Sequence, residues 1–275
     1  MKKAYKVLLK AYQQKYAVPQ FNINNLEWTK YILEVCEELK SPVILGVSPK
    51  SVIYMGGYQT VRKLVDGLLK DLKISIPVII HLDHAKSYEE TEKAIVAKFD
   101  SVMIDAAKED VNTNILITNR TFKRAKGIMV EAEIGKIENN MDTDKTDLDS
   151  VIYFNKKAKF DLLAPAIGNY HGIKNIPPEI DLELLGAISN SIKKPLVLHG
   201  GTNLSKEILQ ETIKLGVAKI NFNTELQDAW AKALKAYVSL NPNEIDPRKI
   251  IGAGEMALKE VVKTKISILN SASKE

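Results

Sequence analysis

Short apolar runs alternate with longer amphipathic stretches along almost the whole chain of 275 residues, and this alternation limits the possible folds more than any other feature. The amphipathic stretches, for example residues 25–40 and 87–98, carry apolar residues at the spacing of one helix face. Strand and helix repeated in this order predict a parallel sheet. The apolar runs with the length of buried strands are residues 17–22, 42–47, 77–83, 100–105, 127–133, 161–167, 195–200 and 217–223.

Eight strand–helix units are the number found in a TIM barrel, which we therefore predict as the fold. The expected architecture is α/β, a TIM (β/α)8 barrel in a single domain over residues 1–275 with extra helices at the C-terminal end. No low-complexity segment and no linker rich in proline or glycine divides the chain. An open, doubly wound sheet is the alternative, and it is less well supported because the first turn between strand and helix lacks a glycine fingerprint.

The alternation of residues within single strands offers an internal test of the barrel. Successive residues of a barrel strand point inward and outward, and the outward side chains pack against helices. In residues 78–83, one face is apolar and the other becomes polar toward the C-terminal end, where TIM-barrel active sites lie. In the last strand, the same pattern turns Ala218, Ile220 and Phe222 outward. The chemically active residues expected to point inward are His81, Asp83, Asp105, Glu131, Glu133, Lys219, Asn221 and Asn223.

Charge and composition exclude several classes of protein. The net charge of +5 comes from 39 basic and 34 acidic residues spread along the chain, which does not indicate nucleic-acid binding but suits an anionic substrate. The lone cysteine, Cys36, excludes an internal disulfide and fits a reducing compartment. The first residues do not form a signal peptide, and no apolar run is long enough to cross a membrane. A soluble, cytoplasmic protein without a membrane partner is therefore expected.

The chain has four histidines, and each lies at or just past the end of a predicted strand. Any one of them alone would be taken as a structural histidine. Four on the same rim indicate a shared site, and three imidazoles with an open fourth position are the ligand set of a catalytic zinc ion. We predict His84, His171 and His199 as the ligands because each follows its strand, whereas His81 lies deeper and is expected to support the site or the core.

Four carboxylates are predicted to point into the same barrel: Asp83, Asp105, Glu131 and Glu133. Pairing with an inward lysine such as Lys219 would account for part of their charge. Four inward carboxylates are nevertheless costly to bury without a cation, which a metal site would supply. Asp83 adjoins a predicted metal ligand and would therefore be placed to exchange protons with a bound substrate.

Two glycine- or asparagine-containing turns end the seventh and eighth predicted strands. They are "HGGT" at residues 199–202 and "NFNT" at residues 221–224. Exposed backbone amides at these two places form the usual phosphate site of the TIM-barrel fold, and Gly172 could add another amide. The alternative for such a glycine turn is a purely structural role at the end of a strand.

Motifs in order along nearly the whole chain resemble the class II, zinc-dependent fructose-bisphosphate aldolases. This resemblance implies a TIM barrel, a dimer or larger assembly, and cleavage of fructose 1,6-bisphosphate into dihydroxyacetone phosphate and glyceraldehyde 3-phosphate. A phosphorylated sugar substrate and a homodimer or homotetramer are the partners expected. The matching motifs are "VPQFNINNLEWTKYI", "SPVILGVS", "YMGGYQTV", "HLDH", "SVMID", "VEAEIG", "LAPAIG", "HGGT", "KINFNTE" and "DPRK".

The resemblance also implies roles for individual residues. Asp83 matches the catalytic proton donor, and the three histidines named above match the ligands of the catalytic Zn2+. Asp105 and Glu133 match an alternate metal position beside that site, and a second divalent or monovalent cation is a further expectation. Arg248 resembles an arginine that a partner subunit lends to the distal phosphate. The remaining residues that match substrate-binding positions are Ser48, Gly172, Lys174, Gly200, Gly201, Thr202, Asn221, Phe222, Asn223 and Thr224.

The segment at residues 136–145 departs from the family pattern, because it is shorter and has no glycines. In the family, a loop glutamate at this place moves the proton at C3 of dihydroxyacetone phosphate. Glu138 and Asp142 are the nearest acids here, and we predict Glu138 because its side chain is longer and it directly follows the strand of Glu133. Lys174 stands one position earlier than the corresponding family lysine.

Three other functions remain open from the sequence alone. A tagatose-bisphosphate or other ketose-bisphosphate aldolase differs from the predicted enzyme only in its sugar, although the "DPRK" motif favours fructose. A Schiff-base aldolase would use the inward Lys219 as its nucleophile. A zinc-binding homologue without catalytic activity is the third possibility, and the presence of Asp83 argues against it.

Overall fold

A computed structural model describes residues 1–137, 145–172, 177–202 and 204–275 of the chain. Within these residues, eight parallel strands close into a barrel in sequence order from β1 to β8, so the predicted TIM barrel is confirmed. All eight predicted strands are present. Their bounds are β1 Val18–Asn22, β2 Val43–Val47, β3 Val78–Ala85, β4 Ser101–Ile104, β5 Met129–Ile134, β6 Leu162–Pro165, β7 Leu196–Leu198 and β8 Val217–Phe222.

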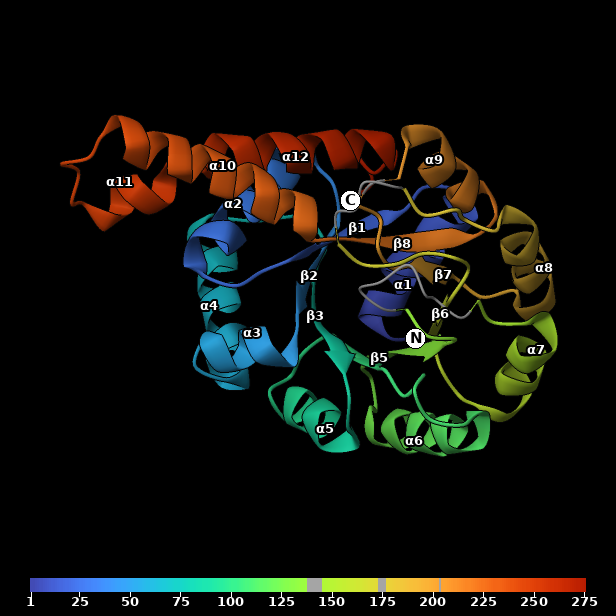
Figure 1. Cartoon of the computed structure of the whole chain (residues 1–275). Helices are drawn as coiled ribbons and strands as arrows, with labels where there is room; N and C mark the ends of the chain where they lie inside the picture. Colours follow the sequence, from blue (N-terminus) through green and yellow to red (C-terminus); the bar gives the residue numbers. More distant parts are fainter. Residues whose placement is uncertain (138–144, 173–176, 203) are drawn as a thin grey trace.

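Most of the helices surround the barrel on its outside, as Figure 1 shows. The amphipathic stretches at residues 25–40 and 87–98 form α2 and α5, as their periodicity predicts. The helices are α1 Lys3–Gln14, α2 Leu26–Glu38, α3 Pro49–Tyr54, α4 Tyr58–Asp71, α5 Tyr88–Val96, α6 Val111–Arg124, α7 Leu148–Lys157, α8 Leu182–Ile192, α9 Lys206–Lys214, α10 Thr224–Leu240, α11 Pro247–Gly252 and α12 Glu255–Ile268.

Two apolar clusters fill the space on either side of the barrel wall. The larger cluster lies between strands and helices and includes Ile80, Val130 and Phe222. The smaller one gathers inward residues such as Ile79 and Met129 with the buried face of α1. Helix α1 therefore packs against apolar side chains of the barrel interior, and the polar inward residues are left to the other end of the strands.

Two details of the strands differ from the sequence-based prediction. Strand β3 continues to Ala85 rather than ending at residue 83, because its register with β4 shifts between Leu82 and Ala85. Ala218 packs in the inner cluster and not outward with Ile220, since the register between β7 and β8 also shifts beside it. An irregular register of this kind re-aims side chains, and strand alternation alone does not reveal it.

The expected extra helices follow the last strand. Helix α12 packs against both α10 and α2, and Trp230 of α10 meets Trp28 of α2 edge-on at 6.1 Å between ring centres. The short α11 lies at the far end of this group, away from the barrel (Figure 1). In the described part of the chain, no helix combines the length and apolar character that crossing a bilayer requires.

Several helices that follow strands begin at polar capping residues. The side chains of Ser87, Asp110 and Ser205 accept hydrogen bonds from backbone N–H groups in the first turns of α5, α6 and α9. In a TIM barrel these helix starts lie at the C-terminal end of the strands. The capped first turns therefore fix the loops around the mouth of the barrel.

Candidate active site

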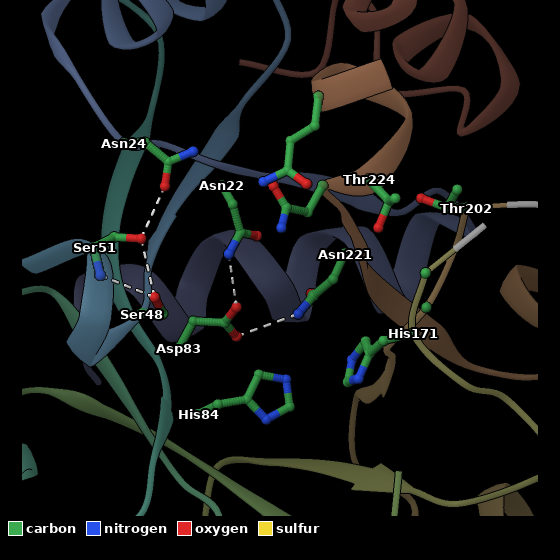
Figure 2. A pocket seen from close by; sticks show the side chains of 14 residues that line it. Asn22, Asn24, Ser48, Ser51, Asp83, His84, His171, Thr202, Asn221 and Thr224 are labelled. Atoms are coloured by element: carbon green, nitrogen blue, oxygen red, sulfur yellow. Dashed lines mark hydrogen bonds between the residues drawn. The ribbon is translucent and has the colours of Figure 1, made fainter. Parts of the chain in front are cut away.

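A cavity of about 420 Å³ opens at the C-terminal end of the strands (Figure 2). Asp83 and His84 of β3 lie on its floor, and the segments that follow β7 and β8 form one side. Side chains from six of the strand ends or following loops thus meet in one place. The lining residues are Asn22, Asn24, Ser48, Ser51, Asp83, His84, His171, Gly172, Gly200, Thr202, Asn221, Asn223, Thr224 and Gln227.

Two asparagine side chains hold the Asp83 carboxylate in the cavity. Asn22 donates from Nδ2 to Asp83 Oδ2 at 3.0 Å, and Asn221 donates from Nδ2 to Asp83 Oδ1 at 3.4 Å (Figure 2). Burial works against the charge of Asp83, but the positive charges of His84 and Lys219 outweigh it and lower its pKa. Asp83 is therefore ionised at neutral pH and fixed in position, as a proton acceptor requires.

Three histidines converge beside Asp83. Their ring centres are 4.6 Å apart for His84 and His199, 5.0 Å for His84 and His171, and 5.8 Å for His171 and His199. Imidazoles that share one tetrahedral ion at about 2.0–2.1 Å from each nitrogen have ring centres about 5 Å apart. One nitrogen of each ring lies within 4.8 Å of the others. The three rings therefore fit a single metal ion with an open fourth position.

The pKa values of these rings differ. Burial, followed by the neighbouring charge of His84, lowers the pKa of His171 to about 3. Burial also lowers the pKa of His199. For His84, burial is outweighed by the charge of Asp83 and a hydrogen bond with Asp105, which raise its pKa to about 9. Two rings are thus neutral at pH 7, and an incoming metal would displace a proton from the third.

A second donor group adjoins the first through His84. Its Nδ1 lies 3.0 Å from Asp105 Oδ2 and 3.9 Å from Glu133 Oε2, and the three groups can be arranged around one ion. Glu133 Oε2 is buried without a hydrogen-bond partner among the described residues. Burial, followed by the charge of Asp105, raises the pKa of Glu133 well above its usual range. An unpartnered buried carboxylate oxygen is the feature expected where a cation belongs.

A fully buried polar network supports His199 from below. Its Nε2 lies 2.8 Å from Glu131 Oε1, and the other oxygen of Glu131 accepts a 2.6 Å hydrogen bond from Lys219 Nζ. His81 joins this network at 3.4 Å from Lys219 Nζ and 2.8 Å from Ser101 Oγ. Glu131 fixes the orientation of the His199 ring, as a carboxylate behind a metal-binding histidine does. His81 therefore belongs to this network and lies outside the histidine trio.

The turn after β7 brings backbone close to the cavity. Gly200 has a φ of +69°, and a Cβ at this position would lie 2.1 Å from the carbonyl oxygen of Tyr170. Only glycine fits there without moving the loop that carries His171. Gly201 donates its N–H to the carbonyl of Asn221, which ties this turn to the end of β8. Because α10 begins directly after Asn223, its first turn also faces the same side of the cavity.

The sequence profile of fructose-bisphosphate aldolase class-II matches residues 2–274. The chain belongs to the class II fructose-bisphosphate aldolase family. Members of this family are metal-dependent aldolases, which are lyases that act on a carbon–carbon bond.

Named relatives of the class II family are similar along their whole length. The chain is 43% identical to the fructose-bisphosphate aldolase of Geobacillus stearothermophilus over 279 residues, which cover 98% of this chain and 96% of that protein. It is 42% identical to the fructose-bisphosphate aldolase of Staphylococcus aureus over 278 residues, with the same two coverages. Among solved structures, the YdjI aldolase from Escherichia coli K12 matches with a TM-score of 0.85 and 30% identity over 98% of both chains.

Most residues assigned to the substrate site from the class II resemblance line the cavity. They are Ser48, Gly172, Gly200, Thr202, Asn221, Asn223 and Thr224.

Two others do not line it. Phe222 is fully buried and packs on Phe21 with 6.0 Å between ring centres, so its side chain does not reach the cavity. Gly201 packs against Ile220 and Phe222 instead, where a Cβ would lie 2.6 Å from the Ile220 side chain.

Three predicted residues are not placed in the cavity of their own chain. Glu138 and Lys174 lie outside the described residues, as does the alternative base Asp142. Arg248 is 89% exposed on α11 and pairs with Asp246 at 2.7 Å. Helix α11 lies away from the barrel, and Arg248 is not among the residues that line the cavity (Figure 1).

Four polar residues of the cavity were not predicted: Asn22, Asn24, Ser51 and Gln227. Asn22 ends β1, so the rule that found Asp83 at the end of β3 could also have found it. Asn24 accepts a hydrogen bond of 2.8 Å from Ser51 Oγ, which links the loop after β1 to helix α3 after β2 (Figure 2). Gln227 lies one turn into α10, where no strand-end signal applies.

Proposed function

We propose that this chain catalyses the reversible cleavage of fructose 1,6-bisphosphate into dihydroxyacetone phosphate and glyceraldehyde 3-phosphate, with a zinc ion as its metal. The observation that carries this proposal is the position of the ionised Asp83 beside three histidines in one cavity. Membership of the class II family and the names of its relatives support the choice of sugar.

His84, His171 and His199 are proposed to hold the zinc ion. Their spacing and the neutral state of two of the rings support this assignment. When bound, zinc supplies a Lewis acid that stabilises negative charge on the substrate oxygens as the bond between C3 and C4 breaks.

Asp83 is proposed as the group that exchanges the proton of the C4 hydroxyl. In cleavage it accepts this proton, the C4 oxygen becomes the aldehyde oxygen, and the electron pair of the C3–C4 bond remains with the dihydroxyacetone phosphate half. In condensation Asp83 returns the proton. Asn22 and Asn221 keep its two oxygens in place during both directions.

A second proton must be added to C3 after cleavage and removed from it in condensation. We assign this step to Glu138, because its side chain is longer than that of Asp142 and it directly follows the strand of Glu133 in the sequence. Asp83 is already committed to the C4 oxygen, so a separate group is required.

The turn at Gly200–Thr202 and the segment at Asn221–Thr224 are proposed to bind the phosphate of dihydroxyacetone phosphate. The glycine turn after β7 and the first turn of α10 line the same side of the cavity, and a helix N-terminus suits a phosphate dianion. Gly172 and Lys174 would contribute from the preceding loop. Ser48 belongs to the opposite side of the cavity and would face the glyceraldehyde phosphate end.

The geometry disfavours the Schiff-base alternative. Lys219 is fully buried, pairs with Glu131 at 2.6 Å, and does not line the described cavity. A Schiff-base lysine must reach the substrate carbonyl as a free amine.

We further propose that the active protein is a cytoplasmic homodimer or homotetramer, with residues 1–275 as one domain in each subunit. The exposed apolar side chains Leu240 and Ile245 lie beside α11, which carries Arg248. Contact between copies through this region would cover them and bring Arg248 to a neighbouring cavity.

A coupled assay with fructose 1,6-bisphosphate and tagatose 1,6-bisphosphate tests the proposed substrate. We expect the fructose compound to be cleaved with the higher kcat/KM and both activities to disappear when a chelator removes the metal. A higher kcat/KM for the tagatose compound would reassign the enzyme within its superfamily. Activity that survives complete removal of metal, with covalent trapping by borohydride, would instead indicate a Schiff base on a lysine.

Arg248→Ala is expected to raise KM for the bisphosphate by about tenfold or more, because an arginine can form two parallel hydrogen bonds with a phosphate. Binding of dihydroxyacetone phosphate alone should change little, because that ligand lacks the distal phosphate. The two measurements are steady-state cleavage and calorimetric titration. Lys249→Ala, a neighbouring cation paired with Glu244, is the matched control and should leave both unchanged. If Arg248→Ala weakened the bisphosphate and dihydroxyacetone phosphate to the same extent, the assignment of Arg248 to the distal phosphate would be wrong.

A further inference from the structure

A lysine side chain already stands at the second donor group of the metal site. Lys86 Nζ contacts Asp105 Oδ2, the same oxygen that lies 3.0 Å from His84 Nδ1. The side chain of Asp105 is only 3% exposed, whereas that of Lys86 is 57% exposed. The ammonium group therefore reaches from the surface onto a buried carboxylate.

The backbone around Lys86 is held in a defined position. Its N–H donates to Glu90 Oε2 at 2.7 Å, and the next residue, Ser87, caps α5 by accepting the N–H of Glu90 at 3.2 Å. His84 has a φ of +56°, at the place where β3 and β4 shift register. This bend at His84, together with the capped start of α5, places Lys86 beside the end of β4.

The charges at this place explain why a cation is needed there. Asp105 and Glu133 are 5% and 1% exposed, and both adjoin His84. Two carboxyl groups buried side by side are costly to ionise together without a nearby cation. With His84 they form a donor set that could hold an ion of its own. The ammonium group of Lys86 compensates the charge of Asp105, one of the three members of this donor set.

We propose that Lys86 is a tethered cation that takes the place of a second metal ion at Asp105 and Glu133, and so limits the chain to a single bound metal. The inference rests on the proposed three-histidine site, because His84 belongs to both donor groups. It replaces the second cation expected from the family resemblance with a residue of the chain itself.

Removing the charge of Lys86 while keeping most of its length should open the second position. We expect Lys86→Met to bind about two zinc ions per chain after equilibration with zinc and gel filtration, compared with about one for the parent. Elemental analysis measures the ratio, and a calorimetric titration with zinc should show a second binding step. Lys86→Arg keeps the positive charge and should bind the same amount as the parent.

Two further variants make the result specific. Lys50→Met removes an exposed lysine that lines the same side of the mouth and has no contact with Asp105 among the described residues, so its metal content should equal that of the parent. In the double variant with Lys86→Met and Asp105→Asn, the additional zinc should be lost again. Retention of the extra ion in that double variant would place it elsewhere on the protein and overturn the proposal.

The outcomes separate this inference from the proposed function. A single zinc ion in Lys86→Met, with the affinity of the parent, would overturn the role of Lys86 while leaving the three-histidine site intact. A parent protein that binds no zinc would overturn both. An additional zinc ion that depends on both the Lys86 substitution and Asp105 supports the tethered cation.

Discussion

Asp83→Ala is expected to lower the rate of bisphosphate cleavage by about two orders of magnitude or more while the bound metal is retained. Asp83 lies in the cavity between Asn22 and Asn221, next to the histidine trio, but is not one of its members. Its removal therefore takes away the acceptor of the C4 proton and leaves the metal donors in place. Steady-state kinetics and elemental analysis on the same preparation measure the two effects.

Exchange of the C3 proton of dihydroxyacetone phosphate with solvent provides the control for Asp83. This exchange does not involve the C4 oxygen, so it should persist in Asp83→Ala when cleavage is lost. Asp83→Asn keeps the shape of the side chain but cannot accept a proton, and it should lose cleavage to a similar extent. Turnover close to that of the parent in either variant would remove Asp83 from the mechanism.

The barrel could be predicted from sequence because two periodicities agree along the chain. The repeated order of strand and helix along the chain indicated eight strand–helix units. Within β3, the alternation of side chains separated the apolar face from His81 and Asp83. Buried strand faces are selected by hydrophobic burial, which local sequence records directly. The meeting of His84, His171 and His199 followed from the same logic, because all eight strand ends of a barrel face one mouth.

The features that could not be predicted depend on contacts between distant residues. The extension of β3 to Ala85 and the inward position of Ala218 come from register shifts against neighbouring strands. Phe222 lies in a segment that matches a substrate-binding motif, yet strand alternation turns its side chain into the outer core. The alternation was the better guide, because a motif match names a segment and does not give the direction of each side chain.

Lys86 shows the same limit at the site itself. In the sequence it is one of many lysines after a strand, where a solvated role is the usual expectation. Its contact with Asp105 arises only because the bend at His84 and the capped start of α5 bring two loops together. A pairing of this kind requires the three-dimensional arrangement of β3 and β4, which no local pattern encodes.

His199→Ala is expected to abolish both metal binding and activity. His199 is fully buried, and Glu131 holds its ring orientation through Nε2 at 2.8 Å. Residues that only orient a metal ligand are worth about 10- to 100-fold in metal affinity, so loss of a ligand itself should cost at least about 100-fold. Elemental analysis after gel filtration should therefore find almost no zinc in this variant, and the coupled assay should find no cleavage.

His81 offers a matched control for the loss of His199, because it is equally buried and belongs to the same polar network but lies outside the trio. His81→Gln should keep its zinc even if its melting temperature is lower than that of the parent. A metal that binds only the folded state also raises the melting temperature, so added zinc should stabilise the parent and His81→Gln but not His199→Ala. Zinc content and zinc-dependent stabilisation equal to the parent in a folded His199→Ala protein would contradict the assignment of the metal site. We expect His199→Ala to lose both its zinc and its stabilisation by zinc, and His81→Gln to keep both. Loss of a buried histidine alone would not produce this difference, because both residues are buried; it requires that His199, and not His81, contacts the ion.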